Sequence, residues 1–313
     1  MLSFIVKRLL AAIPIAGVVG LFIFSLLYIA PGDPAAIIAG DQATAEDIER
    51  IRISLGLDRP FMARFTEWMW GVLHGDLGQS IFSKMPVTSL ILQRLEPTLS
   101  LLALSFVVAV VIAIPMGVLA AAKRDQAADR AVMIVAVLGF SVPSFVVAYL
   151  LVYFLALGAN LFPVQGYSSI SSGILPWLRS LVLPSLALGF SFAALATRMT
   201  RVSMLEVLHQ DYVRAATARG AARSTVLFIH AFKNAAIPVV TVLGIGVAGL
   251  MGGAVVTETV FSIPGVGRLM IDAILRRDYP VVQGVVLYSS LAYVAINVLV
   301  DILYVMIDPR IRY

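Results

Sequence analysis

Six apolar runs, separated by short charged segments, constrain the fold of this 313-residue chain more than any other feature. A transmembrane helix needs about 20 mostly apolar residues. Runs of about this length lie near residues 9–30, 99–122, 131–157, 181–199, 235–256 and 281–307. The chain is 60% apolar and 13% charged, whereas soluble domains carry roughly 45–50% and 25%. The pattern predicts an all-α polytopic membrane protein and argues against a water-soluble enzyme.

The distribution of basic residues predicts the orientation, because Lys and Arg concentrate in cytoplasmic loops. With a cytoplasmic N-terminus, the inner segments hold 13 basic and five acidic residues, and the outer segments hold 10 basic and 12 acidic residues. We therefore expect both termini in the cytoplasm. The net charge of +5 does not indicate nucleic-acid binding, because it is dispersed over short loops. The first run is too long for a signal-peptide core, so we expect it to be retained as a helix that ends at Pro31-Gly32-Asp33-Pro34.

Several kinds of site are excluded because the chain lacks the residues they need or has them far apart. Without cysteine it forms no disulfide, thiolate metal site or cysteine nucleophile. The three histidines, His74, His209 and His230, fall on opposite sides of the membrane in this topology and make a poor metal site. No Gly-x-x-x-x-Gly-Lys-Ser/Thr phosphate loop is present. We expect no metal site and no catalytic residue in this chain. The energy for its activity is expected to come from a separate subunit or from a gradient.

The only large outer segment, residues 32–96, is expected to be helical. Thr44 and Asp47 have the spacing of a capping box, and Gly56 is a plausible helix stop. A second helix is expected from Pro60, with an apolar face made of Phe61, Phe65, Trp68 and Val72. Two interpretations stay open for this segment: helices that pack on each other and on the membrane interface, or a docking surface for an external partner.

The cytoplasmic segment between the fourth and fifth runs is the most informative part of the chain. It predicts a short amphipathic helix with an apolar stripe, ending at Gly220, which supplies the left-handed residue of a helix stop. The stripe consists of Val207, Leu208, Tyr212, Val213 and Ala216. A rigid helix of this kind can lie in a groove of a soluble partner. The alternative is a helix that lies on the lipid headgroups.

At this segment the chain resembles the membrane subunits of ATP-binding-cassette (ABC) importers. Their coupling helix carries a Glu-Ala-Ala…Gly signature, which Ala215, Ala216 and Gly220 match and from which Arg214 departs. The run Asp211–Gly220 is closer to the dipeptide/oligopeptide branch. Further resemblance to that branch lies in Pro31–Pro34, Leu55–Pro60, Gly75–Ser80, Glu258–Gly267 and Arg277–Pro280. The large outer segment resembles the B-type permease of this branch.

The resemblance implies the type I importer permease fold with six transmembrane helices. It divides the chain into a first helix (1–31), an extracytoplasmic helical segment (32–96) and a transmembrane domain (97–313) with a coupling helix at about 211–223. The implied ATPase-coupling residues are Asp211, Tyr212, Arg214, Ala215, Ala216, Arg219 and Gly220. The implied partners are a C-type permease, two ATP-binding subunits that hold ATP and Mg, and an extracytoplasmic peptide-binding protein. The implied location is the bacterial cytoplasmic membrane.

Polar residues in the apolar runs suggest a substrate pathway. Ser141-Val142-Pro143-Ser144 should kink the third run, and kinked helices with small polar residues can line a channel, so Ser141 and Ser144 are candidates. Glu258, at the outer end of the fifth run, either faces the substrate or caps the segment that follows. Asp301 and Asn297, four residues apart, are interpreted as a structural pair rather than a functional acid.

Gly244, Gly246 and Gly249 match a dinucleotide fingerprint but lie in an apolar run without a preceding strand. Close helix packing that continues through Gly253 explains them better.

The expected function is peptide import as one half of a permease heterodimer. Glutathione, nickel or a nickel chelate, and opine-like solutes remain alternative cargoes. An ion-gradient secondary transporter remains an alternative class, although embedded charges and broken repeats of that kind are not evident.

Overall fold

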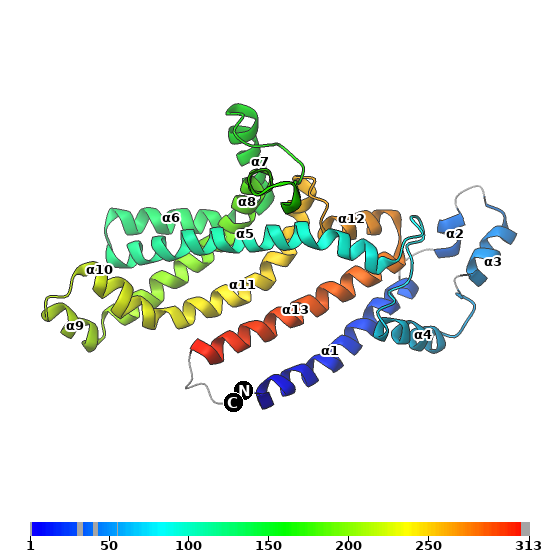
Figure 1. Ribbon diagram of the computed structural model, residues 1–313, viewed down its shortest axis with the longest axis horizontal. Coiled ribbons are helices and arrows are strands. Elements are labelled where there is room, and N and C mark those ends of the chain that lie inside the picture. Colours follow the sequence, from blue (N-terminus) through cyan, green and yellow to red (C-terminus); the bar gives the residue numbers. More distant parts are fainter. Residues whose placement is uncertain (1, 30–33, 40–42, 55, 308–313) are drawn as a thin grey trace. The chain divides into compact units, whose positions relative to one another are not determined.

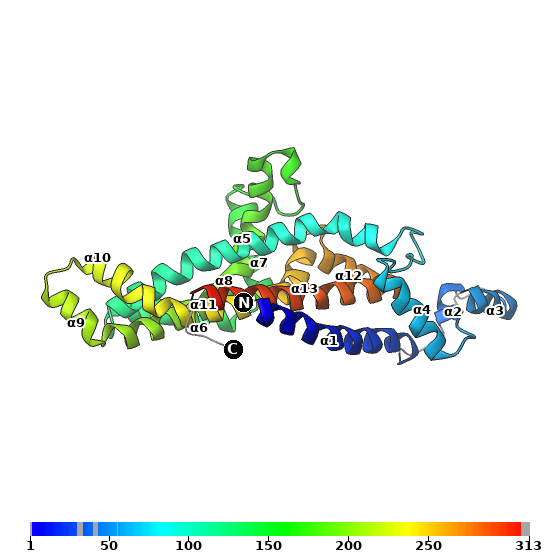
Figure 2. The same cartoon turned by 60° about the horizontal axis from the view of Figure 1, so that its bottom comes forward.

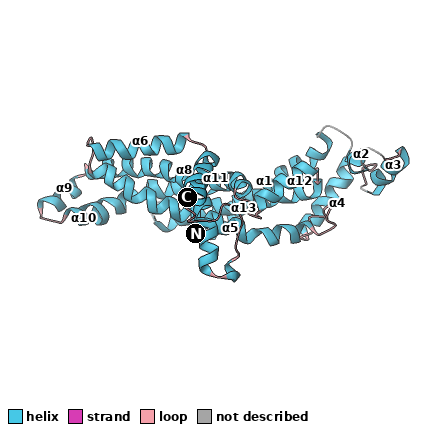
Figure 3. Cartoon of the chain, turned by 90° about the horizontal axis from the view of Figure 1, so that it is seen from above, coloured by secondary structure: helices cyan, strands magenta, loops and turns pink. Residues whose placement is uncertain are grey.

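The fold is built from helices in a computed structural model that describes residues 2–29, 34–39, 43–54 and 56–307. Within these residues no β-strand forms, and Gln79 and Pro86 make a single isolated bridge (Figure 3). The helices are α1 (Leu2–Ile29), α2 (Pro34–Ala39), α3 (Ala45–Ser54), α4 (Phe61–Leu73), α5 (Val87–Ala122), α6 (Ala127–Ser141), α7 (Ser144–Leu151), the π-helix η1 (Val152–Gly158), the 3₁₀-helix η2 (Ile170–Ser172), α8 (Ile174–Leu208), α9 (Asp211–Ala218), α10 (Arg223–Thr225), the π-helix η3 (Val226–Ala231), α11 (Phe232–Val260), α12 (Val266–Arg276) and α13 (Tyr279–Ile307).

Four continuous helical stretches within the described residues are long and apolar enough to cross a membrane. They are Val87–Ala122, Ile174–Leu208, Arg223–Val260 and Tyr279–Val300. The pair formed by α6 and α7–η1 makes a fifth span if it is counted as one. The first predicted span forms α1, of which Ile13–Ser25 is a described apolar stretch. The all-helical membrane fold is therefore confirmed. Four of the six predicted spans, or five with the bent pair, meet the length and hydropathy of a membrane span within the described residues, so the count of six stays a prediction.

The third predicted span is broken where the sequence indicated a kink. Val142 is extended, and α6 and α7–η1 meet at an angle of 105°. The cause is local, because a residue before proline is driven out of the helical region and Pro143 itself has no N–H to donate. Pro143 then serves as the N-cap of α7.

The chain forms two compact units. The first consists of Arg94–Arg268 with the two chain ends, and the second of Val6–Gln93 with Leu269–Val294. In the first unit α5, α6, α8 and α11 run side by side (Figure 1). Helix α8 is the central one, because 72% of its apolar window is buried. The core cluster of this unit includes Leu181 of α8 together with Leu101, Val239 and Phe261, all nearly inaccessible to solvent.

Small residues bring the helices of the first unit together, as the glycine pattern predicted. A Cβ atom on Gly246 would overlap the Phe192 ring, and one on Gly244 would overlap Val300. At Gly253 an added Cβ would lie 2.6 Å from Leu188. Close packing is therefore confirmed for these three positions. Gly249 differs, because nothing lies within 4 Å of its added Cβ.

In the second unit, α3 begins and ends as its sequence predicted. The Asp47 N–H donates to Thr44 Oγ1 and the Thr44 N–H donates to Asp47 Oδ2, each at 3.2 Å, which completes the capping box. The two hydrogen bonds from Thr44 hold the pKa of the Asp47 carboxyl below its usual value. At the other end Gly56 has φ +62°, and the Leu57 N–H donates to the Arg52 carbonyl in a Schellman arrangement.

Helix α4 begins directly after Pro60, and its apolar face packs on α1. The Phe24 ring of α1 lies 5.4 Å from Phe61, 5.6 Å from Phe65 and 5.5 Å from Trp68, measured between ring centroids. Such aromatic contacts add about 0.5–1.5 kcal/mol each beyond burial. The predicted face is thus a packing face. Helix α3 packs on α2.

Candidate functional site

Helix α9 is a short connecting helix that joins the long helices α8 and α11 at one end of the first unit (Figure 2). It begins after a break at His209 and Gln210, where the Gln210 carbonyl accepts the N–H groups of Val213 and Arg214. His209 closes the end of α8, with Nδ1 2.6 Å from the Leu205 carbonyl oxygen. The two long helices therefore present α9 on a defined turn.

Gly220 ends α9 for the reason that the sequence indicated. It has φ +83°, a conformation that side chains disfavour, and no atom lies within 4 Å of an added Cβ. The Ala221 N–H donates to the Ala216 carbonyl and the Gly220 N–H donates to the Thr217 carbonyl, which is the Schellman pattern. The helix is shorter than the predicted range of about 211–223, because residues 219–222 form this turn.

The predicted coupling residues lie on two different faces of α9. Val213 and Ala216 are buried, at 3% and 4% exposure, and α9 packs with this face on η3. Tyr212, Arg214, Ala215 and Arg219 lie on the exposed face. Ala216 therefore contacts its own chain and is not available to another protein, unlike Ala215. Tyr212 also departs from the predicted apolar stripe, because it is 43% exposed.

Long-range hydrogen bonds fix the α9 segment to its neighbours. Arg223 Nη2 donates to the Ala122 carbonyl at the end of α5, at 2.7 Å. Asn234 of α11 donates through Nδ2 to the Tyr212 hydroxyl at 2.8 Å. These two bonds connect the α9 segment to the ends of α5 and α11. Neither partner was indicated by the sequence pattern.

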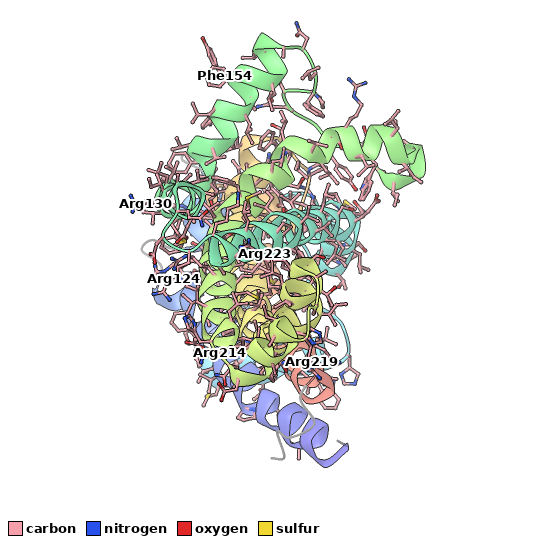
Figure 4. All side chains as sticks on the ribbon, turned by 90° about the vertical axis from the view of Figure 1, so that its left-hand side faces the viewer. Arg124, Arg130, Phe154, Arg214, Arg219 and Arg223 are labelled. Atoms are coloured by element: carbon pink, nitrogen blue, oxygen red, sulfur yellow. The ribbon has the colours of Figure 1, made fainter. Side chains whose placement is uncertain are left out.

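The exposed end of the first unit is basic. Figure 4 looks onto this end and shows Arg214 and Arg219 on the α9 segment, with Arg124, Arg130 and Arg223 on neighbouring elements. Asp211 and Arg214 form only a weak pair, at 3.8 Å and fully in solvent. Behind this surface Arg201 of α8 binds Asp129 of α6 in a bidentate pair, at 2.6 and 2.7 Å. That pair connects α6 to α8, and no pattern in the sequence indicated that these two side chains meet.

The predicted pathway residues fall into two environments. Ser141 ends α6, and its hydroxyl donates back to the Val137 carbonyl at 2.8 Å. Ser144 starts α7 on the other side of the break and is half-buried. The structure thus places both serines at the 105° bend, and their role in a pathway stays a prediction.

Glu258 is completely buried at the end of α11. Its Oε1 accepts the Thr98 hydroxyl at 2.6 Å, and its Oε2 accepts the Arg268 N–H at 3.0 Å. Thr98 Oγ1 in turn accepts the Val266 N–H at 2.8 Å. Gly265 lies directly against the carboxylate and has no room for a side chain. This geometry agrees with the capping alternative, in which Glu258 organises the turn into α12.

The described residues contain no group of three or more His, Asp or Glu side chains that could hold a metal ion. The Asp301 side chain and the Pro31–Asp33 motif lie outside the described part of the chain. The α9 surface is the strongest candidate site among the described residues, because it combines an exposed face with a fixed position between two long helices.

Comparison with known proteins identifies the chain's family. Residues 113–313 match the family described as the inner membrane component of binding-protein-dependent transport systems, and residues 1–103 match the N-terminal membrane component of the same systems. The chain belongs to this family. It is thus a membrane-embedded permease subunit of an ABC importer, and the family implies ATPase and binding-protein partners.

The similar proteins agree over the full length. A probable peptide ABC transporter permease of Sinorhizobium fredii is 49% identical over 99% of both chains. A putative peptide transport system permease of Brucella abortus is 47% identical over the whole of both chains. A glutathione transport system permease of Escherichia coli is 41% identical, again over both whole chains. The family assignment favours an ATP-driven importer over an ion-gradient transporter.

Proposed function

We propose that this chain is one of two permeases of a peptide importer and that α9 is its coupling helix. In this proposal the exposed face of α9 docks into a cleft of a separate ATPase subunit, and ATP and Mg are bound there and not by this chain. The observation that supports this proposal best is that α9 is short, ends in a Schellman turn and is hydrogen-bonded to a neighbouring helix, while Tyr212, Arg214, Ala215 and Arg219 remain exposed.

The proposal includes the rest of the assembly. A second, C-type permease would complete the translocation pathway, since a peptide bears both termini and a polar backbone that a narrow apolar pore would reject. An extracytoplasmic binding protein would deliver the cargo, and residues 32–96 would lie on its side of the membrane. Both termini and α9 would be cytoplasmic, in agreement with the excess of basic residues there. The chain would then divide at about residues 31 and 96.

Peptides are the proposed cargo, because two of the similar proteins are named as permeases of peptide transporters. Glutathione is the second candidate, on the strength of the Escherichia coli relatives. An uptake experiment in vesicles that hold the complete importer separates these cargoes. Unlabelled dipeptide, tripeptide and glutathione each compete against the uptake of a labelled peptide, and the strongest competitor identifies the cargo. Uptake with this chain as the only permease would contradict the heterodimer.

The coupling role is tested at Ala215, which is exposed, rather than at Ala216, which is part of the chain's own packing. An Ala215→Trp variant should obstruct docking and reduce coupled uptake roughly tenfold or more, the size of a disrupted hot spot. Ala159→Trp is the matched control, because Ala159 is an exposed alanine in the turn directly after η1 and lies outside the basic end that holds α9. Equal uptake and equal ATP hydrolysis in the two variants would refute the coupling role.

A further inference from the structure

An apolar groove lies between α5, α6 and α8, away from the α9 surface. Its cavity of about 200 Å³ is lined by side chains of all three helices, among them Met116, Ala131, Val135, Phe190, Ala194 and Thr197. Sites for drug-sized solutes hold roughly 300–1,000 Å³. The groove is therefore too small for a bulky solute, and its lining suits a single alkyl chain.

Basic side chains continue this groove at the end that leads toward α9. Arg198 follows Ala194 by four residues, so it lies on the groove-lining side of α8, and Lys123 is in the turn directly after the end of α5. Both residues are exposed, and neither forms an ion pair within the described part of the chain. Arg201 follows Thr197 by four residues as well, but Asp129 already binds its guanidinium group.

An exposed arginine that forms no ion pair and lies beside an apolar groove is available to an anionic partner. A cation on a membrane-spanning helix is costly unless it is paired or reaches the interface. Basic pockets between transmembrane helices on the cytoplasmic side bind anionic lipid headgroups. The apolar lining and the adjacent positive charge together complement one molecule, which has an alkyl chain and an anionic head.

We propose that this groove binds an anionic phospholipid of the cytoplasmic leaflet. One acyl chain lies between Val135 and Phe190, and the headgroup phosphate contacts Arg198 and Lys123. The inference rests on the cytoplasmic placement of α9 in the proposed function. It adds a lipid site to a subunit that is otherwise described by its protein partners.

The first test is a lipid titration of the complete, delipidated importer, followed by native mass spectrometry. Phosphatidylglycerol should bind more tightly than phosphatidylcholine with the same acyl chains. Arg198→Gln should weaken the phosphatidylglycerol affinity about fivefold, the contribution of one basic residue at an anionic surface. Arg276→Gln removes an equally exposed arginine of α12 and should change nothing. Equal affinities for both lipids, or equal effects of both variants, would overturn the proposal.

A second test locates the lipid with a fluorophore on a single introduced cysteine. The labelling is specific within this chain, because its own sequence contains no cysteine. Val135 is 52% exposed at the groove, so a fluorophore on V135C should be quenched more by brominated phosphatidylglycerol than by brominated phosphatidylcholine. Equal quenching would contradict the site, and so would cross-linking of V135C to a second permease in native membranes. Peptide uptake is measured on the same samples. If the importer binds both lipids equally but Ala215→Trp still uncouples transport, only this inference is refuted. If Ala215→Trp does not uncouple transport but phosphatidylglycerol is still preferred, only the proposed function is refuted.

Discussion

The Ser80 hydroxyl donates a hydrogen bond of 2.6 Å to Asp278 Oδ2, although 198 residues separate the two side chains. Both are buried in the second unit, and Asp278 Oδ1 also accepts the Ile81 N–H at 3.2 Å. The contact joins two segments that the sequence presented only as separate short motifs, Gly75–Ser80 and Arg277–Pro280. The carboxylate therefore holds the loop after α4 against the start of α13.

Removal of this carboxylate should destabilise the second unit. Asp278→Ala leaves the Ser80 hydroxyl and the Ile81 N–H without their acceptor, at a cost of about 1–3 kcal/mol. Thermal unfolding of the purified complex measures the effect. Asp58→Ala, at an exposed position, should leave the midpoint almost unchanged. A midpoint for Asp278→Ala that equals this control would show that the hydrogen bonds contribute nothing.

The Asp129–Arg201 pair should be worth far more than the Asp211–Arg214 pair. Asp129 is 3% exposed and Arg201 21%, whereas both members of the second pair are exposed. Loss of one partner of a buried pair costs about 3–5 kcal/mol, because the other charge is left uncompensated. Arg201→Ala should approach this range, discounted for the partial exposure of Arg201. Arg214→Ala should cost under about 1 kcal/mol. Double-mutant cycles on unfolding free energies measure both couplings, and similar values would contradict the burial argument.

The glycines of α11 offer a matched pair of substitutions. Gly246→Ala forces a methyl group into the Phe192 ring and should destabilise by about 1–3 kcal/mol. Gly249→Ala places the same methyl group in open space and should be neutral or stabilise by up to about 1 kcal/mol through helix propensity. Unfolding midpoints of the two variants in detergent give the comparison. The packing argument fails if the two substitutions change the midpoint alike.

Helix α3 should fray in acid. Hydrogen bonds from Thr44 lower the pKa of Asp47 in the folded chain, so their stabilising effect is present above the unfolded pKa of about 3.9. It is lost as the pH falls through the lower, folded pKa. Amide hydrogen-exchange protection factors in α3 should therefore fall below about pH 4. Thr44→Ala should show low protection at every pH, and a profile identical to wild type would be evidence against the cap.

Local features of the fold could be predicted because their causes lie within a few residues. Thr44 and Asp47 cap α3 through hydrogen bonds to each other, whereas Pro143 breaks the third apolar run and Gly220 ends α9 through their own backbone geometry. The amphipathic pattern also placed Val213 and Ala216 together on one apolar face, and both are buried. That this face packs on η3 of the same chain was not predicted, because η3 is brought there only by the tertiary fold. The coupling role of the segment stays a prediction.

The sequence by itself determined the helices, the membrane-spanning runs and the short connecting helix between the fourth and fifth runs. Hydropathy, periodicity and capping are properties of contiguous residues, so they need no knowledge of the neighbours in space. Only the tertiary structure decided that Ala216 faces η3, that Thr98 and Gly265 enclose Glu258 and that Asp129 meets Arg201. These partners are distant in sequence, and many weak packing contacts between whole helices select them. No single residue carries that information.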